Sequence, residues 1–217
     1  MSDNAATVCT IEQDPATYLA VLKRAYSKHY LEESDVWTND PQMRSFPALV
    51  QGSVKLTSSA RVIDVGCGAG RDVEYFAGLC DSVTGLDIYR HDYWETVAQQ
   101  HANASFYCTD LLSYSADAKY DLVIDNGCFH HQHPDQLSAY LAKVVSILKK
   151  DGCFALSTFK NPAIDEFVDV NGRLHKYFGD AELQKILSTA GFSVFREFDI
   201  YRANKKDYYR LSFCRLV

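Results

Sequence analysis

Two kinds of hydrophobic pattern alternate along most of this chain. Short, almost wholly apolar runs occupy residues 61–65, 82–87, 104–108, 120–125, 152–159, 192–199 and 208–215. Runs of this kind are typical of strands that are covered on both faces of a sheet. Between them, helical patterns cover 70–80, 92–101, 134–149 and 180–190. The alternation predicts right-handed βαβ units in a doubly wound, mostly parallel α/β sheet of seven strands. The last two strands are separated only by a polar turn, so we expect an antiparallel hairpin at the C-terminal edge.

Two segments lie outside this alternation. Residues 1–60 contain a predicted helix at about 15–30 and then an irregular stretch from Trp37 to Pro47. The connection 160–179 is longer than a typical loop between a strand and a helix. Ligands of open α/β sheets bind beyond the carboxyl ends of the strands. We therefore predict one domain over 1–217, with 1–60 as a helical lid segment, 61–217 as the cofactor-binding core and 160–179 as a substrate-side insertion.

Composition narrows the class of protein. The chain has 217 residues, 47% of them hydrophobic, and a net charge of -6. A negative net charge provides no general attraction to nucleic acid or to an anionic membrane, so neither is expected as a partner. No apolar run approaches the ~18 residues of a membrane span, and the first residues lack the pattern of a signal peptide. Cysteines are scattered without a C-x-x-C pair, which argues against disulfides and zinc. We expect a cytoplasmic monomer or homodimer.

The most informative segment is the glycine-rich turn after the first predicted strand. Gly66, Gly68 and Gly70 stand at every second position, where the backbone can take positive φ and approach a ligand closely. A dinucleotide fold would show G-x-G-x-x-G, but Arg71 stands at the third glycine position. Asp64, just before the turn, would repel a pyrophosphate and attract a cationic amino-acid group. The turn therefore favours S-adenosylmethionine over a nicotinamide dinucleotide.

At residues 61–215 the chain resembles the class I S-adenosylmethionine-dependent methyltransferases. The segments that carry the resemblance are 62–71, 85–88, 108–111, 120–131 and 152–156, in the order and at the spacing of the family's motifs. The resemblance implies a Rossmann-like fold and S-adenosyl-L-methionine as cofactor. The Gly-Cys-Phe-His-His sequence at 127–131 is similar to small-molecule members, including the thiopurine and tellurite-resistance type branch.

The resemblance also implies a set of cofactor contacts. Asp87 would bind the ribose hydroxyls, and Asp110 would accept a hydrogen bond from the adenine amino group. The bland alternatives are that Asp87 caps the following loop and that Asp110 starts a turn. The implied cofactor-binding residues are Tyr26, Tyr30, Asp64, Gly66, Cys67, Gly68, Gly70, Arg71, Asp87, Ile88, Asp110, Leu111, Asn126 and Gly127.

Two histidines are the candidates for catalysis. His130 and His131 follow the fourth predicted strand, and a histidine there can accept a proton from the acceptor. The alternative is that one of them packs under the next helix and orients the loop. No acidic or cysteine partner stands at metal-ligand spacing, so we expect no metal.

Aromatic residues are the candidates for the acceptor site. Tyr26 and Tyr30 could contact the cofactor's carboxylate, while their alternative role is to pack the lid onto the sheet. The residues expected to line the acceptor site are Trp37, Phe129, Phe159 and Tyr177.

These patterns predict an enzyme that transfers a methyl group to a small-molecule acceptor through an oxygen, sulfur or nitrogen nucleophile. The asparagine-proline or proline-cysteine motifs of base and amide methylation are not found after the fourth predicted strand. A catalytically silent cofactor-binding subunit is the second hypothesis, and a nicotinamide oxidoreductase is the third.

Overall fold

The computed structural model describes residues 11–35, 37–38, 40–203 and 205–217. The start of the predicted lid segment, residues 1–10 with Cys9, lies outside the described residues, as do Val36, Asn39 and Asn204.

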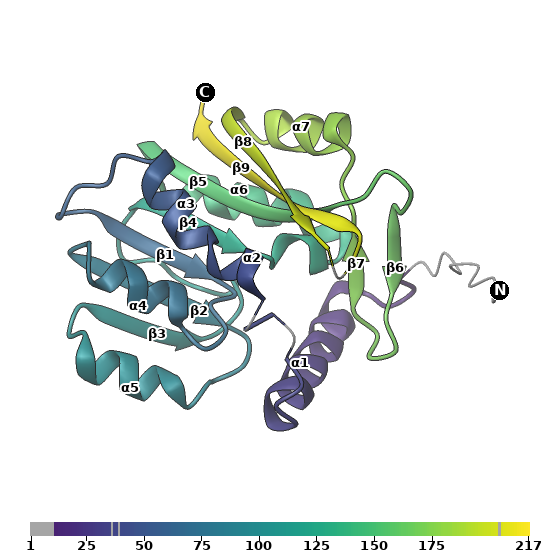
Figure 1. Cartoon of the computed structure of the whole chain (residues 1–217), viewed down its shortest axis with the longest axis horizontal. Helices are drawn as coiled ribbons and strands as arrows, with labels where there is room; N and C mark the ends of the chain where they lie inside the picture. Colours follow the sequence, from purple (N-terminus) through teal and green to yellow (C-terminus); the bar gives the residue numbers. More distant parts are fainter. Residues whose placement is uncertain (1–10, 36, 39, 204) are drawn as a thin grey trace.

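A seven-stranded sheet forms the centre of the molecule (Figure 1). Its strands run in the order β3-β2-β1-β4-β5-β9-β8. The first five are parallel, whereas β9 is antiparallel to both β5 and β8. The doubly wound sheet and its antiparallel edge hairpin, expected from the hydrophobic pattern, are confirmed. The bounds of the strands are β1 Arg61–Val65, β2 Ser82–Asp87, β3 Ala104–Cys108, β4 Tyr120–Asn126, β5 Leu148–Lys160, β8 Phe192–Arg202 and β9 Asp207–Leu216.

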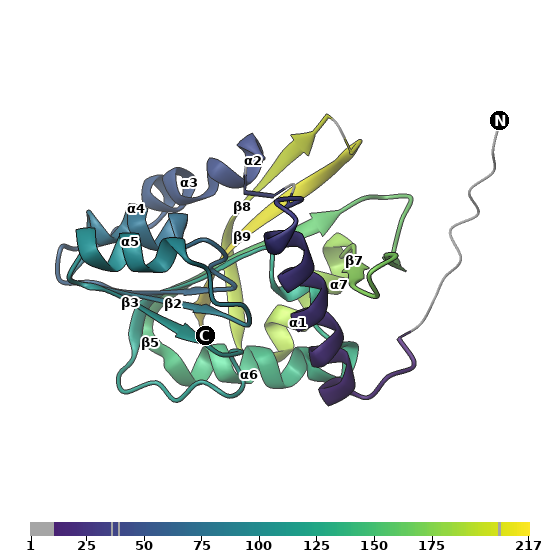
Figure 2. The ribbon, with the colours of Figure 1, turned by 90° about the horizontal axis from the view of Figure 1, so that it is seen from below.

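Helices cover both faces of the sheet (Figure 2). On one face lie α3 (Phe46–Ser53), α4 (Arg71–Ala77) and α5 (Tyr93–Gln100), and on the other lie α6 (Leu137–Ile147) and α7 (Asp180–Thr189). Along β1, Val62 packs into the first layer and Ile63 into the second, because successive side chains of a strand point to opposite faces. This burial on both sides explains why the strands are continuous apolar runs.

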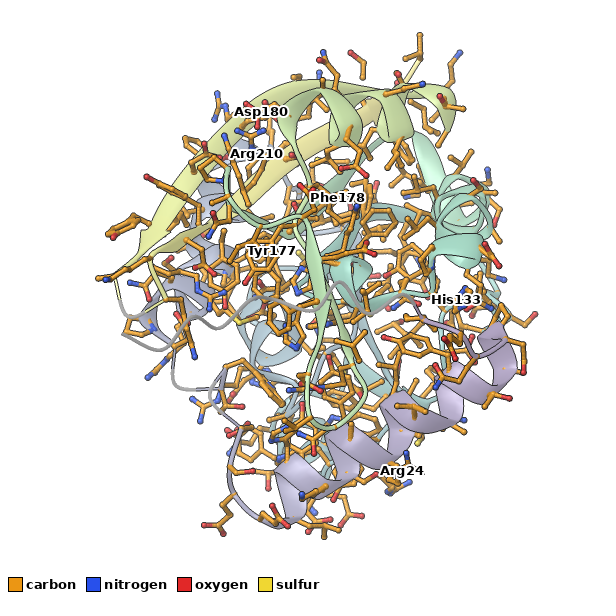
Figure 3. The ribbon with its side chains drawn as sticks, turned by 90° about the vertical axis from the view of Figure 1, so that its right-hand side faces the viewer. Arg24, His133, Tyr177, Phe178, Asp180 and Arg210 are labelled. Atoms are coloured by element: carbon orange, nitrogen blue, oxygen red, sulfur yellow. The ribbon has the colours of Figure 1, made fainter. Side chains whose placement is uncertain are left out.

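The N-terminal helix α1 (Pro15–Leu31) stands apart from these layers, beside a small hairpin (Figures 1 and 3). Its start is fixed by Pro15 and by the Asp14 carboxylate, which accepts hydrogen bonds from the backbone N–H groups of Ala16 and Thr17. The hairpin consists of β6 (Glu166–Val168) and β7 (Leu174–Lys176). Among the helices that the described residues form, none combines the length and apolar character that crossing a membrane requires.

Two segments are more regular than the sequence pattern predicted. The stretch 37–47, expected to be irregular, contains α2 (Pro41–Arg44) and the start of α3. An Asp-Pro pair starts α2, since Asp40 caps the backbone N–H of Gln42. The connection 160–179 contains the β6–β7 hairpin, whose turn depends on Gly172 at φ +82°.

The helix predicted over 134–149 is shorter than expected. It begins as a 3₁₀ turn, η2 (Pro134–Gln136), and α6 ends at Ile147. From Leu148 the chain already pairs with Tyr120 of β4 and belongs to β5. The helical spacing of apolar residues therefore extends to Leu148, although pairing with β4 makes this residue part of a strand.

Candidate active site

A cavity of about 790 Å³ opens at the carboxyl ends of β1, β2, β4 and β5. In the parallel register, Val65 of β1 lies opposite both Leu86 and Asp125, so the residues just beyond these strands meet at one edge. This edge is the switch point of the sheet, where ligands of doubly wound folds bind. The sequence-predicted residues that line it are Tyr26, Tyr30, Trp37, Gly66, Asp87, Ile88, Asp110, Leu111, Asn126, Gly127, His130, His131, Phe159 and Tyr177.

The glycine-rich turn forms one side of this cavity. Gly66 and Gly68 have φ values of +75° and +52°, which an L side chain rarely adopts. A Cβ atom at Gly66 would lie 2.9 Å from the Cβ of Cys128, and one at Gly68 would lie 2.9 Å from the hydroxyl of Tyr30. Conformation and space therefore both require glycine at these two positions, and the bare backbone of Gly66 faces the cavity.

Asp87 is held rigidly at the end of β2. Its Oδ2 accepts a hydrogen bond from the N–H of Gly68 (2.8 Å), and its Oδ1 accepts one from Tyr89 (2.9 Å). Burial raises the pKa of Asp87 to about 6, although both backbone donors oppose that shift. A carboxylate can accept about four hydrogen bonds, so both oxygens keep a lone pair for a ligand.

A second cavity, of about 100 Å³, lies behind the glycine turn, and the buried Asp64 and the half-buried Asp72 line it. Asp64 is 2% exposed, and its Oδ1 has no hydrogen-bond partner among the described residues. Burial and the neighbouring charge of Asp72 raise the pKa of Asp64 well above its usual range. Asp72 accepts a hydrogen bond from the Asn126 amide nitrogen (3.0 Å), while the Asn126 Oδ1 is buried without a partner in the described part of the chain. These oxygens can accept from a cationic ligand group.

The buried charge of Asp64 predicts a measurable strain in the ligand-free protein. We expect Asp64→Asn to increase the free energy of unfolding by about 1–3 kcal/mol at pH 7.5, because it removes a buried negative charge that no donor or cation compensates among the described residues. The raised pKa means that wild-type Asp64 takes up a proton as the pH falls, so the gain should shrink toward pH 5. Urea denaturation of wild type and Asp64→Asn at pH 7.5 and pH 5 measures this difference in the free energy of unfolding.

Asp92→Ala is the control for this measurement, since Asp92 is exposed and makes no side-chain cap to its helix. If Asp64→Asn destabilised the protein at pH 7.5, the carboxylate would be stabilising rather than strained.

The β2–β3 side of the cavity offers an apolar floor. Leu111 is buried and Ile88 half-buried, and both line the cavity beside Asp110. The Oδ1 of Asp110 accepts a hydrogen bond from the N–H of Ser113 (3.0 Å), so the turn-starting alternative holds as well. Its second oxygen has no such local partner among the described residues.

The β5 side carries an aromatic wall, which consists of His130, Phe159, His175, Tyr177 and Tyr209. Phe159 is at its centre: its ring lies 3.7 Å from the ring centre of His130, 5.2 Å from that of Tyr177 and 5.6 Å from that of Tyr209, all nearly parallel. Figure 3 shows Tyr177 on the segment that leads from β7 to α7. The backbone of that segment bonds to the end of β5, since the Phe178 N–H donates to the Phe159 carbonyl.

The two candidate histidines have different surroundings. His131 is tied to the fold, because its Nδ1 contacts the carbonyl oxygen of Leu174. His130 is 1% exposed, and its Nδ1 has no hydrogen-bond partner among the described residues. Burial and the neighbouring histidines hold the pKa of His130 well below its usual value. His130 is therefore a neutral imidazole at physiological pH, whereas the ring of His131 is held by the backbone of β7.

The N-terminal helix is joined to the acceptor side of the cavity. The Tyr18 hydroxyl donates to the backbone carbonyl of His131 and accepts from the N–H of Leu174, both at 2.9 Å. One side chain of α1 thus links the turn η1 (Phe129–His131) to β7.

The predicted aromatic residues of this segment meet above the cavity. The indole N–H of Trp37 donates to the Tyr30 hydroxyl (3.2 Å), and the ring of Trp37 contacts Tyr26 edge-on at 5.5 Å. The guanidinium of Arg173, from the β6–β7 hairpin, lies over both Tyr26 and Trp37. These aromatic residues therefore pack α1 and the segment after it against the β6–β7 hairpin, and they also line the cavity.

Six sequence-predicted residues do not line the main cavity. Phe129 is fully buried between Tyr140 and Phe178 under α6, so the expectation that it lines the acceptor site is corrected. Gly70 also lies away from both cavities, because a Cβ there would meet Phe106 in the core at 2.8 Å.

Cys67 and Arg71 line the small cavity instead. Asp64 and Gly68 also line the small cavity and not the main one.

Among the cavity residues that sequence reasoning missed are Asp72, Arg202 and Tyr209. Asp72 stands in the first turn of α4, where its proximity to Asp64 follows from the turn geometry that the glycines create. Arg202 and Tyr209 enter the cavity from the edge hairpin. No local pattern marked them, because only the pairing of β9 with β5 brings Tyr209 opposite Phe159.

Comparisons with known proteins agree with this geometry. Residues 62–152 match the family model described as "Methyltransferase domain". The chain is 30% identical to 1,6-didemethyltoxoflavin-N1-methyltransferase of Burkholderia thailandensis, solved with 1,6-didemethyltoxoflavin and S-adenosylhomocysteine bound. The two structures superpose with a TM-score of 0.91, covering 97% of this chain and 93% of the other.

Curated relatives match over a shorter region. Cyclopropane-fatty-acyl-phospholipid synthase of Escherichia coli (strain K12) is 28% identical over 66% of this chain, and malonyl-[acyl-carrier protein] O-methyltransferase of Acetivibrio thermocellus is 32% identical over 48%. The chain spans 37% and 38% of the length of these two relatives. Since the solved relative is matched over nearly its whole length, this chain belongs to the class I S-adenosylmethionine-dependent methyltransferases, whose cofactor is S-adenosylmethionine.

Proposed function

We propose that this chain transfers the methyl group of S-adenosylmethionine to a ring nitrogen of a small, flat acceptor. The observation that carries the proposal is the division of one cavity into two halves. One half is lined by the glycine turn and Asp87, and the other by the aromatic wall around Phe159. The Burkholderia thailandensis relative is an N1-methyltransferase by name, which supports nitrogen as the acceptor atom.

The residues of the first half, together with those of the small cavity behind the glycine turn, fit the cofactor. The unpaired buried oxygens of Asp64 and Asn126 provide acceptors for its ammonium group, which no donor among the described residues satisfies. Asp87 would hold the ribose hydroxyls, and Asp110 with Leu111 would hold the adenine. The bare backbone at Gly66, Gly68 and Gly127 would allow close approach, and Tyr26 and Tyr30 would lie near the carboxylate.

When bound, the cofactor supplies an electrophilic methyl group on a positively charged sulfur. The contribution of this chain is to hold the acceptor in line with that methyl group and to exclude water. We propose that the lid segment and the insertion 160–179 perform the exclusion, since Tyr18 joins α1 to β7 at the cavity. His130, neutral and next to Gly127, would accept the proton that the acceptor nitrogen loses.

Methyl transfer can be tested directly. The purified protein would be mixed with S-adenosylmethionine labelled with ¹³C in the methyl group and with acceptors that offer a ring nitrogen, a phenol oxygen or a thiol, 1,6-didemethyltoxoflavin among them. We expect a ¹³C-methyl signal on a ring nitrogen.

The other outcomes distinguish the rival hypotheses. Label on oxygen or sulfur would overturn the choice of nitrogen. S-adenosylhomocysteine binding without transfer to any acceptor would favour the catalytically silent subunit. Thermal stabilisation by NADH and not by S-adenosylhomocysteine would overturn the cofactor.

A further inference from the structure

Arg202 is a buried guanidinium at the end of β8 that lines the acceptor half of the cavity. It is 8% exposed and lies over the rings of Tyr209 (4.3 Å) and Phe159 (4.9 Å). Its partner Asp207 stands opposite it in the edge hairpin, with 3.2 Å between Nε and Oδ1. Neither the Nε nor the Nη1 of Arg202 has a hydrogen-bond partner among the described residues, because the Nε–Oδ1 pair is an ion-pair contact without hydrogen-bond geometry.

Two other buried arginines show how this protein normally pairs a guanidinium. Arg210 donates to Asp199 through Nε and Nη2 and to Asp180 through Nη1, and Figure 3 shows it beside Asp180. Arg173 pairs with Asp169 through both Nε and Nη2. Arg202 has one carboxylate oxygen at its Nε, and the other oxygen of Asp207 accepts from the Tyr177 hydroxyl instead.

A guanidinium presents five N–H donors in a planar fork and no acceptor. Burying it with a donor unpaired is unfavourable unless a ligand completes the pairing. The missing partner must therefore offer an oxygen or another acceptor atom, and a cationic group would be repelled. Phe159 and Tyr209 line the same cavity beside the guanidinium, so a flat ring fits against this part of the wall.

We propose that Arg202 selects acceptors that carry an oxo group on the flat ring, by donating a hydrogen bond from Nη1 to that oxygen. The inference rests on the proposed function, since it concerns the acceptor of the same methyl transfer. It names the acceptor class as oxo-substituted nitrogen heterocycles. A hydrogen bond from a charged donor contributes about 1.5–3 kcal/mol, which corresponds to a preference of roughly 10- to 100-fold over the same ring without the oxygen.

Two probes that differ only in their oxo groups test this proposal. Quinazoline-2,4-dione and quinazoline would each be titrated by calorimetry into protein saturated with S-adenosylhomocysteine. We expect wild type to bind the dione at least about 10-fold more tightly. In Arg202→Gln combined with Asp207→Asn, which leaves no unpaired charge, that preference should disappear while quinazoline affinity stays unchanged.

Lys205→Gln is the matched control, because Lys205 is an exposed cation that lines the same cavity. We expect it to keep the preference for the dione. The inference is overturned if wild type binds the dione no more tightly than quinazoline, including no binding of either, or if the double variant keeps the preference. Loss of S-adenosylhomocysteine binding by wild type would instead contradict the proposed function.

Discussion

Replacing Asp87 with alanine should lower the affinity for S-adenosylhomocysteine by about 100-fold or more. The carboxylate faces the cavity, and backbone N–H groups already orient both of its oxygens. Accepting two ribose hydroxyls therefore costs little conformational entropy. Hydrogen bonds to a charged group contribute about 1.5–3 kcal/mol each, and about 1.4 kcal/mol is a factor of ten in affinity. Isothermal titration calorimetry measures the loss.

Two variants separate ligand binding from damage to the turn. Asp87→Asn keeps the shape of the side chain and loses its charge, so we expect a loss of about 10-fold. Asp92→Ala removes an exposed carboxylate that does not line the cavity and should change nothing. Circular dichroism would check that all three proteins are folded. If the Asp87→Ala variant is folded and binds S-adenosylhomocysteine as tightly as wild type, Asp87 does not belong to the cofactor site.

The pH dependence of binding gives a second readout of the same residue. Burial raises the pKa of Asp87 to about 6 in the ligand-free protein, and the ionised form is the one that accepts ribose hydroxyls. Lowering the pH from 7.5 to 5 should therefore weaken binding by roughly tenfold in wild type, since about nine tenths of such a carboxyl is protonated at pH 5. Asp87→Asn should show a smaller decrease than wild type, because only the protonation of the other buried carboxylates, such as Asp64, remains.

The core of the fold could be predicted because each strand carried its own signal. Residues 61–65 and 120–125 are short, mostly apolar runs, as expected for strands buried on both faces. The strands β1 and β4 have bounds within one residue of those predicted. The start of α2 was missed although Asp40-Pro41 is a helix-start pair, because the stretch 37–47 has no apolar periodicity. The β6–β7 hairpin has strands of only three residues, too short to show an alternation.

The cofactor half of the site was more predictable than the acceptor half. Asp64, Gly66 and Asp87 are fixed by their place at strand ends, and the parallel register brings strand ends together in any such sheet. Arg202 and Tyr209 depend on how the last two strands return along β5, which no local pattern encodes. Phe129 stands beside the candidate histidines in sequence, yet the 3₁₀ turn directs it under α6 and its neighbour His130 into the cavity.

The contrast between His130 and His131 leads to the second large effect. We expect His130→Gln to lower kcat by about 100-fold while the affinity for S-adenosylhomocysteine changes less than about twofold, because general-base catalysis contributes roughly 10²–10⁴ in rate. His131→Gln should act mainly on acceptor KM, since its ring is bound to the Leu174 carbonyl and supports β7. Steady-state kinetics with the acceptor found by ¹³C transfer provide kcat and KM.

A pH profile distinguishes a proton acceptor from a packing residue. A base must be neutral, and burial together with the charges of His131, His175 and Arg202 holds the pKa of His130 well below 6.5. The acid limb of kcat should therefore lie below pH 6.5 in wild type and be absent in His130→Gln. If His130→Gln turned over at the wild-type rate, the unpaired Nδ1 of His130 would be structural, and methyl transfer would depend on positioning by the aromatic wall alone.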